Sequence, residues 1–219
     1  MFSLYGLILT FSCFLAFLWA RSRSQQYGIG VWHIDNVVII SVPFILIGAR
    51  IYHLLTDWEL YADGSLVYWQ FWQGGLGFWG AFLSGLCIFA LYSKINKISF
   101  ISLCTIFSLP LLLSISLGRL GNIANQELVP FAYYESFVTF CLLVILYVWE
   151  KSSKNKKDLN ILFPTLFFYG LNRFFLEFIR TEKKIVGVLN TNQVVSLLVI
   201  ITTLLLWISV FRKKNIKET

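Results

Sequence analysis

The stretch GRLGNIANQEL, residues 118–128, places an arginine, two asparagines, a glutamine and a glutamate between two long apolar runs. The guanidinium of Arg119 offers a planar fork of donors that fits a phosphate through two oxygens. Asn122 and Asn125 add neutral donors and acceptors, and Glu127 is suited to hold an arginine or to act as a base. These residue types predict a pocket for a phosphate-bearing lipid headgroup, while a solvated loop between membrane spans is the alternative.

A second polar group lies in YGLNRFFLEFIR, residues 169–180. Arg173 and Glu177 are four residues apart, so they share one face of a helix and can neutralise each other. One interpretation is a buried ion pair that fixes the register of the helix. The other is that Arg173 and Arg180 face an anionic ligand while Glu177 orients them.

The composition indicates where these polar groups reside. Of the 219 residues, 58% are hydrophobic and only 13% are charged, which predicts an all-α polytopic membrane protein. The net charge is +7, but the basic residues lie between apolar runs, so loop bias and anionic lipid explain them better than nucleic acid. Four cysteines lie within apolar runs at spacings that match neither a metal site nor a disulfide framework.

Seven apolar segments are long enough to cross a bilayer, which takes about 20 mostly apolar residues in a helix. They are residues 2–20, 36–55, 74–93, 98–117, 131–149, 160–180 and 189–211. Twelve of the 18 basic residues follow the first, third, fifth and last segments. The positive-inside rule then predicts an outer N-terminus and a cytoplasmic C-terminus. No leader with a basic start is evident, so we expect the first segment to be a retained span. Because no linker or repeat is visible, we also expect a single membrane domain spanning residues 1–219.

Charges inside these segments need partners. Arg50, Arg173 and Glu177 fall well inside predicted spans, and Glu135 lies just inside the fifth. A charge at bilayer depth costs a few kcal/mol even on lenient insertion scales, so such residues usually face the interior of the bundle and are candidates for function.

Two further stretches belong to the predicted outer side and the third span. Residues 56–73 carry three acidic residues, no lysine or arginine, and many aromatic side chains, as expected of a segment at the level of the outer headgroups. Residues 74–85, GGLGFWGAFLSG, have small residues at helical spacing, which favours close packing of helices. The glycine pair at Gly74 and Gly75 is suited to interrupt the start of this helix and to open space for a substrate.

Five segments stand out in order along the chain: LYGL (4–7), GARIYHLL (48–55), GGLGFWGA (74–81), GRLGNIANQE (118–127) and YGLNRFFLEFIR (169–180). In content and order they resemble the prolipoprotein diacylglyceryl transferase family of bacterial membrane enzymes. The GRxGNxxNxE element is the family signature and the most specific of the five. The resemblance covers most of the chain, and the seven-span topology of the family, with the N-terminus outside, agrees with the charge count.

The resemblance implies a reaction. The family moves the diacylglyceryl group of phosphatidylglycerol to the sulfur of the lipobox cysteine in a preprolipoprotein, forming a thioether and releasing glycerol phosphate. It implies phosphatidylglycerol, lipobox peptides and membrane lipids as partners, no nucleic acid, no cofactor and no metal. We also expect a monomer in the bacterial inner membrane, with seven spans and a reduced or absent periplasmic head.

Site residues follow by motif from the resemblance. Arg119 would bind the lipid phosphate, Arg173 would stabilise the leaving group or the thiolate, and Tyr5 would supply a hydroxyl near the pocket. Catalytic candidates are therefore Arg119, Arg173, Glu127 and Tyr5, and binding candidates are Arg119, Asn122, Asn125, Gly75, Arg50, Glu177 and Arg180.

The chain departs from the family at two places. Many members have a histidine in the GGL segment, often proposed as a base, where this chain has Trp79. His53 is an alternative base, as are Glu127 and a solvent-assisted route, although His53 is also explained as a residue at a helix end without a role. The long outer loop that forms the family's head is missing, and PFAYYE, residues 130–135, aligns with the end of an HPxQLYE-like element.

Besides a lipid-linked transferase that uses another acceptor, two other functions stay open on the residues alone. One is a catalytically inactive relative that binds anionic lipid and alkylates no thiol. The other is a small anion transporter, which Arg50, Arg173 and Glu177 would permit. No pair of related halves with broken helices is visible, and the polar residues gather at the outer end, which disfavours a transporter.

Overall fold

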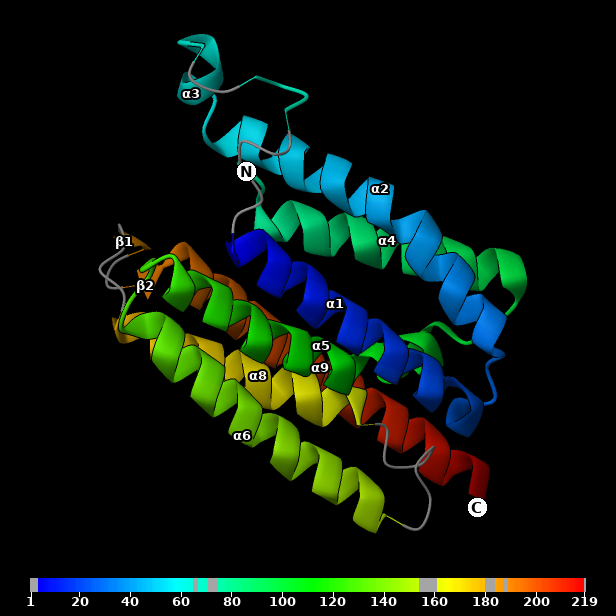
Figure 1. Cartoon of the computed structure of the whole chain (residues 1–219). Helices are drawn as coiled ribbons and strands as arrows, with labels where there is room; N and C mark the ends of the chain where they lie inside the picture. Colours follow the sequence, from blue (N-terminus) through cyan, green and yellow to red (C-terminus); the bar gives the residue numbers. More distant parts are fainter. Residues whose placement is uncertain are drawn as a thin grey trace. The chain divides into compact units, whose positions relative to one another are not determined.

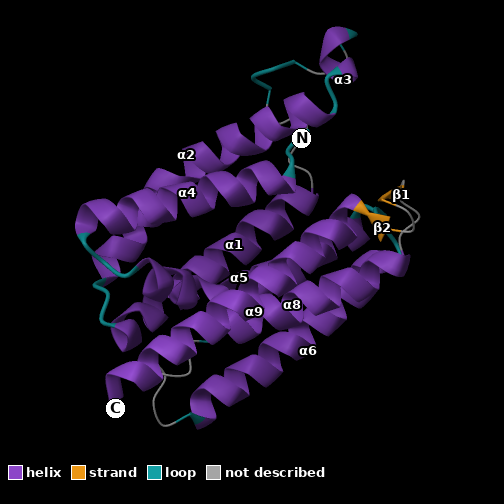
Figure 2. Ribbon diagram, turned by 180° about the vertical axis from the view of Figure 1, so that it is seen from behind, coloured by secondary structure: helices purple, strands orange, loops and turns teal. Residues whose placement is uncertain are grey.

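The structure is a computed structural model that describes residues 4–64, 67–70, 75–153, 161–179, 184–186 and 189–218. Helices make up nearly all of the described chain, and two short strands form a small antiparallel pair (Figure 2). The elements are α1 (Leu4–Arg23), η1 (Ser24–Tyr27), α2 (Val31–Thr56), α3 (Glu59–Ala62), α4 (Phe78–Asn96), α5 (Phe100–Ala124), α6 (Phe131–Ser152), α8 (Leu162–Leu176), η3 (Glu177–Ile179), β1 (Lys184–Val186), β2 (Leu189–Asn190) and α9 (Thr191–Glu218).

Long apolar helices confirm the prediction of an all-α polytopic membrane protein. Among the described residues, five helical segments are long and apolar enough to cross a membrane, namely Leu4–Tyr27, Val31–Thr56, Phe100–Ala124, Phe131–Ser152 and Asn192–Ser209. The other two predicted spans correspond to α4 and α8. Helix α8 has 15 residues, about 22 Å of rise, which is short of the roughly 30 Å hydrocarbon core. The count of seven spans and the orientation of the termini stay predictions.

The chain divides into two compact units. The first unit comprises residues 1–20 and 105–219, and the second unit comprises residues 21–104. The prediction of one domain over the whole chain is not decided by this division and stays a prediction.

The first unit is a group of long helices whose core lies where α5, α6 and α8 meet. Helices α5, α6, α8 and α9 run side by side (Figure 1). A buried apolar cluster consists of Leu109, Leu112, Leu143, Leu146 and Ile161. Further along α5, two hydrogen bonds join α5 to α6. The hydroxyl of Ser116 donates to the backbone carbonyl of Ser136 at 2.8 Å, and the hydroxyl of Ser136 donates to that of Ser116 at 2.9 Å. This reciprocal bond fixes α5 against α6 just before the polar site begins.

The second unit is built on the packing of α2 against α4. A Cβ built on Gly48 would lie 2.4 Å from Ser84 Oγ, and one built on Gly80 would lie 2.1 Å from the carbonyl oxygen of Gly48. Only glycines allow the two backbones to approach so closely. Gly80 and Ser84, two of the later small residues of GGLGFWGAFLSG, therefore serve helix packing, as predicted.

Large apolar side chains cover the outside of the helices. Ile39 in α2, Phe137 and Ile145 in α6, and Leu205 in α9 are each more than 60% exposed. A surface of this kind is stable only when lipid covers it. Polar side chains point inward, among them Arg50, Glu135 and Glu177, which are almost fully buried.

Candidate active site

The polar site starts at the end of α5. We expected residues 118–128 to form a connection outside the span, but α5 continues to Ala124, so Arg119 and Asn122 lie on helical turns. The helix closes with the amide of Gln126 donating to the carbonyl of Ile123 at 3.0 Å and the amide of Glu127 donating to that of Asn122 at 2.8 Å. This is a Schellman-type ending with Gln126 in the left-handed region at φ 57°.

The turn brings Glu127 back over the last helical turn. Asn122 Nδ2 donates to Glu127 Oε2 at 3.3 Å, and Asn125 Nδ2 donates to Glu127 Oε1 at 3.4 Å. Arg119 Nη1 in turn donates to Asn122 Oδ1 at 3.1 Å. Glu127 therefore restrains Arg119 through Asn122, and among the described residues it forms no ion pair with an arginine. Its role as a base stays a prediction.

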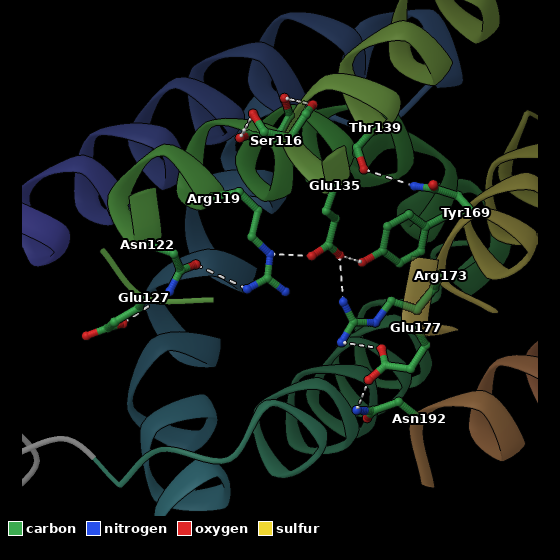
Figure 3. Close-up of polar contacts among 12 residues, drawn as sticks. Ser116, Arg119, Asn122, Glu127, Glu135, Thr139, Tyr169, Arg173, Glu177 and Asn192 are labelled. Atoms are coloured by element: carbon green, nitrogen blue, oxygen red, sulfur yellow. Dashed lines mark hydrogen bonds and ion pairs between the residues drawn. The ribbon is translucent and has the colours of Figure 1, made fainter. Parts of the chain in front are cut away.

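The carboxylate of Glu135 in α6 joins the two arginines (Figure 3). Its Oε2 lies 2.5 Å from Arg119 Nε, and its Oε1 accepts from Arg173 Nη1 at 2.9 Å. The hydroxyl of Tyr169 donates to the same Oε1 at 3.4 Å. Glu135 is fully buried, whereas the side chains of Arg119 and Arg173 are 23% and 17% exposed. The carboxylate thus lies beneath two guanidinium groups that reach toward the surface.

Arg173 in α8 pairs with Glu177 at the start of η3, one turn further along the chain. Arg173 Nη2 lies 3.4 Å from Glu177 Oε2, which confirms that the two residues share a face and form a buried ion pair. Glu177 Oε1 also accepts from Asn192 Nδ2 at 3.0 Å and from Asn190 Nδ2 at 3.4 Å. Glu177 therefore ties Arg173 to the start of α9.

The ring of Phe131 lies under both guanidinium groups. The Cζ atoms of Arg119 and Arg173 are 5.7 and 5.1 Å from its centroid, within the range of a cation–π contact. Phe131 is one helical turn before Glu135, so one face of α6 presents an aromatic ring and a carboxylate to the same two arginines. Both contacts restrict how far the guanidinium groups can move.

The charges of this cluster balance. Arg119 and Arg173 supply two positive charges, and Glu135 and Glu177 supply two negative charges, which makes a buried group of this kind tolerable in a membrane protein. Among the described residues, Nη2 of Arg119 and Nε of Arg173 have no hydrogen-bond partner. The arginines are thus held by part of their donors and present the rest, as an anion-binding site requires.

Tyr5 lies against the signature segment. A Cβ built on Gly121 would meet its Cδ2 at 2.9 Å and its carbonyl oxygen at 3.4 Å, so α1 and α5 touch at this glycine. Tyr5 therefore lies beside the helical turn that carries Asn122. Within the described residues, no hydrogen bond of its hydroxyl is found, so the catalytic role of the hydroxyl stays a prediction.

Arg50 and Gly75 belong to the second unit. The guanidinium of Arg50 is buried and donates to backbone carbonyls: those of Tyr68 at 3.1 Å, Gly75 at 3.0 Å, Gln70 at 3.4 Å and Val67. The space beside Gly75, which we expected to admit a substrate, is filled, because a Cβ there would lie 2.6 Å from Arg50 Nη1. Arg50 therefore binds backbone carbonyls that lie apart in the sequence and holds them together. Substrate binding by Arg50 or Gly75 stays a prediction.

Sequence reasoning noted Glu135 only as a charge inside a span, without a specific role, and assigned no role to Tyr169, Phe131, Asn190 or Asn192. A usable signal existed for Glu135, because an acidic residue inside a predicted span needs a cation and two arginines lay in neighbouring spans. Arg180 lies outside the described residues. Within the described part of the chain, no three His, Cys, Asp or Glu side chains are grouped closely enough to hold a metal ion.

Comparison with known proteins defines the class to which this cluster belongs. The family model described as prolipoprotein diacylglyceryl transferase matches residues 1–129 and 127–209, so the chain belongs to that family. The chain is similar to the phosphatidylglycerol–prolipoprotein diacylglyceryl transferase of Clostridioides difficile, at 29% identity over 98% of this chain and 94% of the relative. Relatives of the same name from Clostridium novyi (28%; 98% and 92%) and Halalkalibacterium halodurans (27%; 93% and 80%) also match.

Proposed function

We propose that this bacterial multi-pass membrane protein transfers the diacylglyceryl group of phosphatidylglycerol to the lipobox cysteine of preprolipoproteins. The observation that carries the proposal is the pair Arg119 and Arg173 on the single buried carboxylate of Glu135. The family and the names of the relatives supply the substrates. The product is a thioether, and glycerol phosphate leaves, which is the first step of lipoprotein maturation.

The chemistry is a displacement at the glycerol carbon of the lipid. The cysteine sulfur attacks this carbon as a thiolate, because the thiolate is the nucleophile. The carbon–oxygen bond to phosphate breaks, and the oxygen leaves with the electron pair. Negative charge on the phosphate therefore grows during the reaction, and donors fixed in advance at that position lower the barrier.

Arg119 and Arg173 provide these donors. Glu135 engages one edge of each guanidinium group and leaves the other donors for the phosphate oxygens. Asn122, held by Glu127, orients Arg119 and completes the polar wall of the headgroup site. Because the carboxylates already neutralise the resting cluster, the arginines do not need a permanently bound anion, which favours release of the phosphate product.

The test is a transfer assay read by mass spectrometry. Purified protein is mixed with phosphatidylglycerol and a lipobox peptide, and an Arg119→Ala protein serves as the comparison. The expected result is a diacylglyceryl mass gain on the cysteine that the variant loses. A wild-type protein that binds lipid and modifies no thiol would indicate the inactive relative, and full activity of Arg119→Ala would remove the central element of the proposal.

A further inference from the structure

One buried aromatic ring lies against both arginines of the first unit. Phe131, the first residue of α6, is 2% exposed, and its ring centroid lies 5.7 Å from the Cζ atom of Arg119 and 5.1 Å from that of Arg173. The face of a benzene ring is electrostatically negative and attracts a cation within about 6 Å, most strongly where water is excluded. A single ring therefore attracts both guanidinium groups.

Glu135 and Phe131 hold the same two arginines by different means. Among the described residues, they are the two side chains that pair with both Arg119 and Arg173. The carboxylate carries a full negative charge, which offsets part of the positive charge that a phosphate would meet. The ring has a quadrupole but no net charge, so it attracts a guanidinium group and leaves the charge of that group in place. The ring is therefore suited to hold a cation that must still bind an anion.

The ring also leaves the hydrogen-bond donors of the arginines for other partners. Arg119 donates through Nη1 to Asn122 and pairs through Nε with Glu135. Arg173 pairs through Nη1 with Glu135 and through Nη2 with Glu177. In the part of the chain that the structure describes, Nη2 of Arg119 and Nε of Arg173 form no hydrogen bond. A cation–π contact needs no acceptor atom, so a ring restrains a guanidinium group without occupying those donors.

Phe163 in α8 serves as a comparison within the same unit. It is 4% exposed, so it is about as buried as Phe131. Within the described residues, no arginine or lysine forms a cation–π contact with Phe163, whereas Phe131 has two such contacts. Burial is thus common to both rings, and the contact with the arginines distinguishes Phe131.

We propose that Phe131 is a positioning residue for the transfer, and this inference rests on the proposed function. Its ring fixes the two guanidinium groups where the charge on the phosphate grows, so that their free donors face the leaving oxygen in the transition state. Because the ring is 2% exposed, it does not reach the lipid and acts only through Arg119 and Arg173. Its removal should therefore lower kcat more than it raises KM, since the position of the donors matters most in the transition state.

The first variant is Phe131→Leu, which keeps an apolar side chain and removes the ring. Transfer to a lipobox peptide is measured by mass spectrometry, with phosphatidylglycerol as the varied substrate. We expect kcat to fall about 30-fold, since a cation–π contact away from water contributes about that factor. The KM for phosphatidylglycerol should change less than about threefold.

A second set of proteins keeps the shape of the ring and weakens its attraction for cations. Phe131 is replaced by phenylalanines that carry one, two or three fluorine atoms on the ring edge, because fluorine withdraws electron density from the ring face and changes the volume little. The kcat should fall in steps, by about twofold for one fluorine and about tenfold for three. The matched control carries three fluorine atoms on the ring of Phe163 and should stay within about twofold of wild type.

A graded loss at Phe131 with an unchanged control would support the inference, because a purely structural role depends on the shape of the ring and not on its electron density. Wild-type kcat with three fluorine atoms on Phe131 would overturn it, whether or not Phe131→Leu is active or folds. An equal loss with three fluorine atoms on Phe163 would also overturn it, by showing that fluorine acts through packing. Absence of transfer by the wild-type protein would instead refute the proposed function itself.

Discussion

Arginines in the two units solve the problem of a charge at membrane depth in different ways. In the second unit, Arg50 donates to the backbone carbonyls of Val67, Tyr68, Gln70 and Gly75 and stacks on Tyr61. In the first unit, Arg119 and Arg173 share the carboxylate of Glu135 and keep donors unused within the described residues. The described partners of Arg50 are neutral carbonyls and an aromatic ring, whereas Arg119 and Arg173 are held by a buried counter-charge.

The difference teaches what each arginine can do. Arg50 is only 3% exposed, and its guanidinium donates to backbone carbonyls. Its removal should therefore leave buried carbonyls without a donor and destabilise the backbone that it holds. Arg119 and Arg173 reach the surface and are positioned by partners beneath them, so they can meet an anion without losing their support. Burial alone does not separate the two cases, but the chemical type of partner does.

The largest expected effect concerns the shape of the guanidinium. Arg119→Lys keeps the positive charge but has one nitrogen, which cannot contact Glu135, Asn122 and a phosphate together. We expect the transfer rate to fall by about 10³-fold, which is close to the effect of removing one fixed hydrogen-bond donor to the transition state. The midpoint temperature of unfolding should change little. Activity within tenfold of wild type would show that a point charge suffices and would weaken the contrast with Arg50.

The next effect concerns Glu135. Glu135→Gln leaves two arginines without their buried counter-charge and should lower the free energy of unfolding by about 3 to 5 kcal/mol. The transfer rate of the folded protein should fall about 100-fold, because the two arginines would no longer be held in position and a small misplacement of catalytic groups costs about that factor. Unfolding in detergent and initial rates measure the two quantities.

A double-mutant cycle sharpens the role of Glu135. Its matched control is Glu177→Gln, which is equally buried but contacts only one of the two arginines. Glu135 should couple energetically to both Arg119 and Arg173, and Glu177 to Arg173 alone. Coupling of Glu177 to Arg119 of the same size would show that the cluster acts as a whole and that Glu135 has no special place in it.

Arg50 should behave in the opposite way. Arg50→Lys loses most of the bonds to backbone carbonyls and should lower the free energy of unfolding by about 3 kcal/mol, since each bond to a charged group contributes roughly 1.5 to 3 kcal/mol. The KM for phosphatidylglycerol should change less than about threefold. Unchanged stability with a strongly raised KM would contradict the comparison and support lipid binding by Arg50, as the sequence predicted.

The smallest effect lies at the end of α5. Gln126 adopts φ 57°, a conformation that costs a residue with a side chain about 1 kcal/mol and glycine very little. Gln126→Gly should therefore raise the free energy of unfolding by about 1 kcal/mol and leave Asn122 and Glu127 in place. Unfolding of the two proteins in detergent, compared side by side, measures this change in free energy. A decrease in stability would mean that the side chain of Gln126 makes a stabilising contact.

Much of the fold and part of the site could be predicted from the sequence. The length and apolar composition of the segments predicted membrane-spanning helices, because a helix satisfies its backbone hydrogen bonds within its own segment. The Arg173–Glu177 pair was predictable for the same reason, since residues four apart meet on any helix. The signature motif indicated Arg119 and Asn122, although it did not indicate that α5 continues through them.

Only the tertiary structure decided which groups hold the arginines. Glu135 is 38 residues before Arg173, and the carbonyls around Arg50 lie 17 to 25 residues after it. Such contacts depend on how α5, α6 and α8 rotate and slide against one another, which Ser116, Ser136 and the apolar core determine together. The sequence by itself determined which charges enter the membrane, and packing decided which of them are held by carboxylates and which by backbone carbonyls.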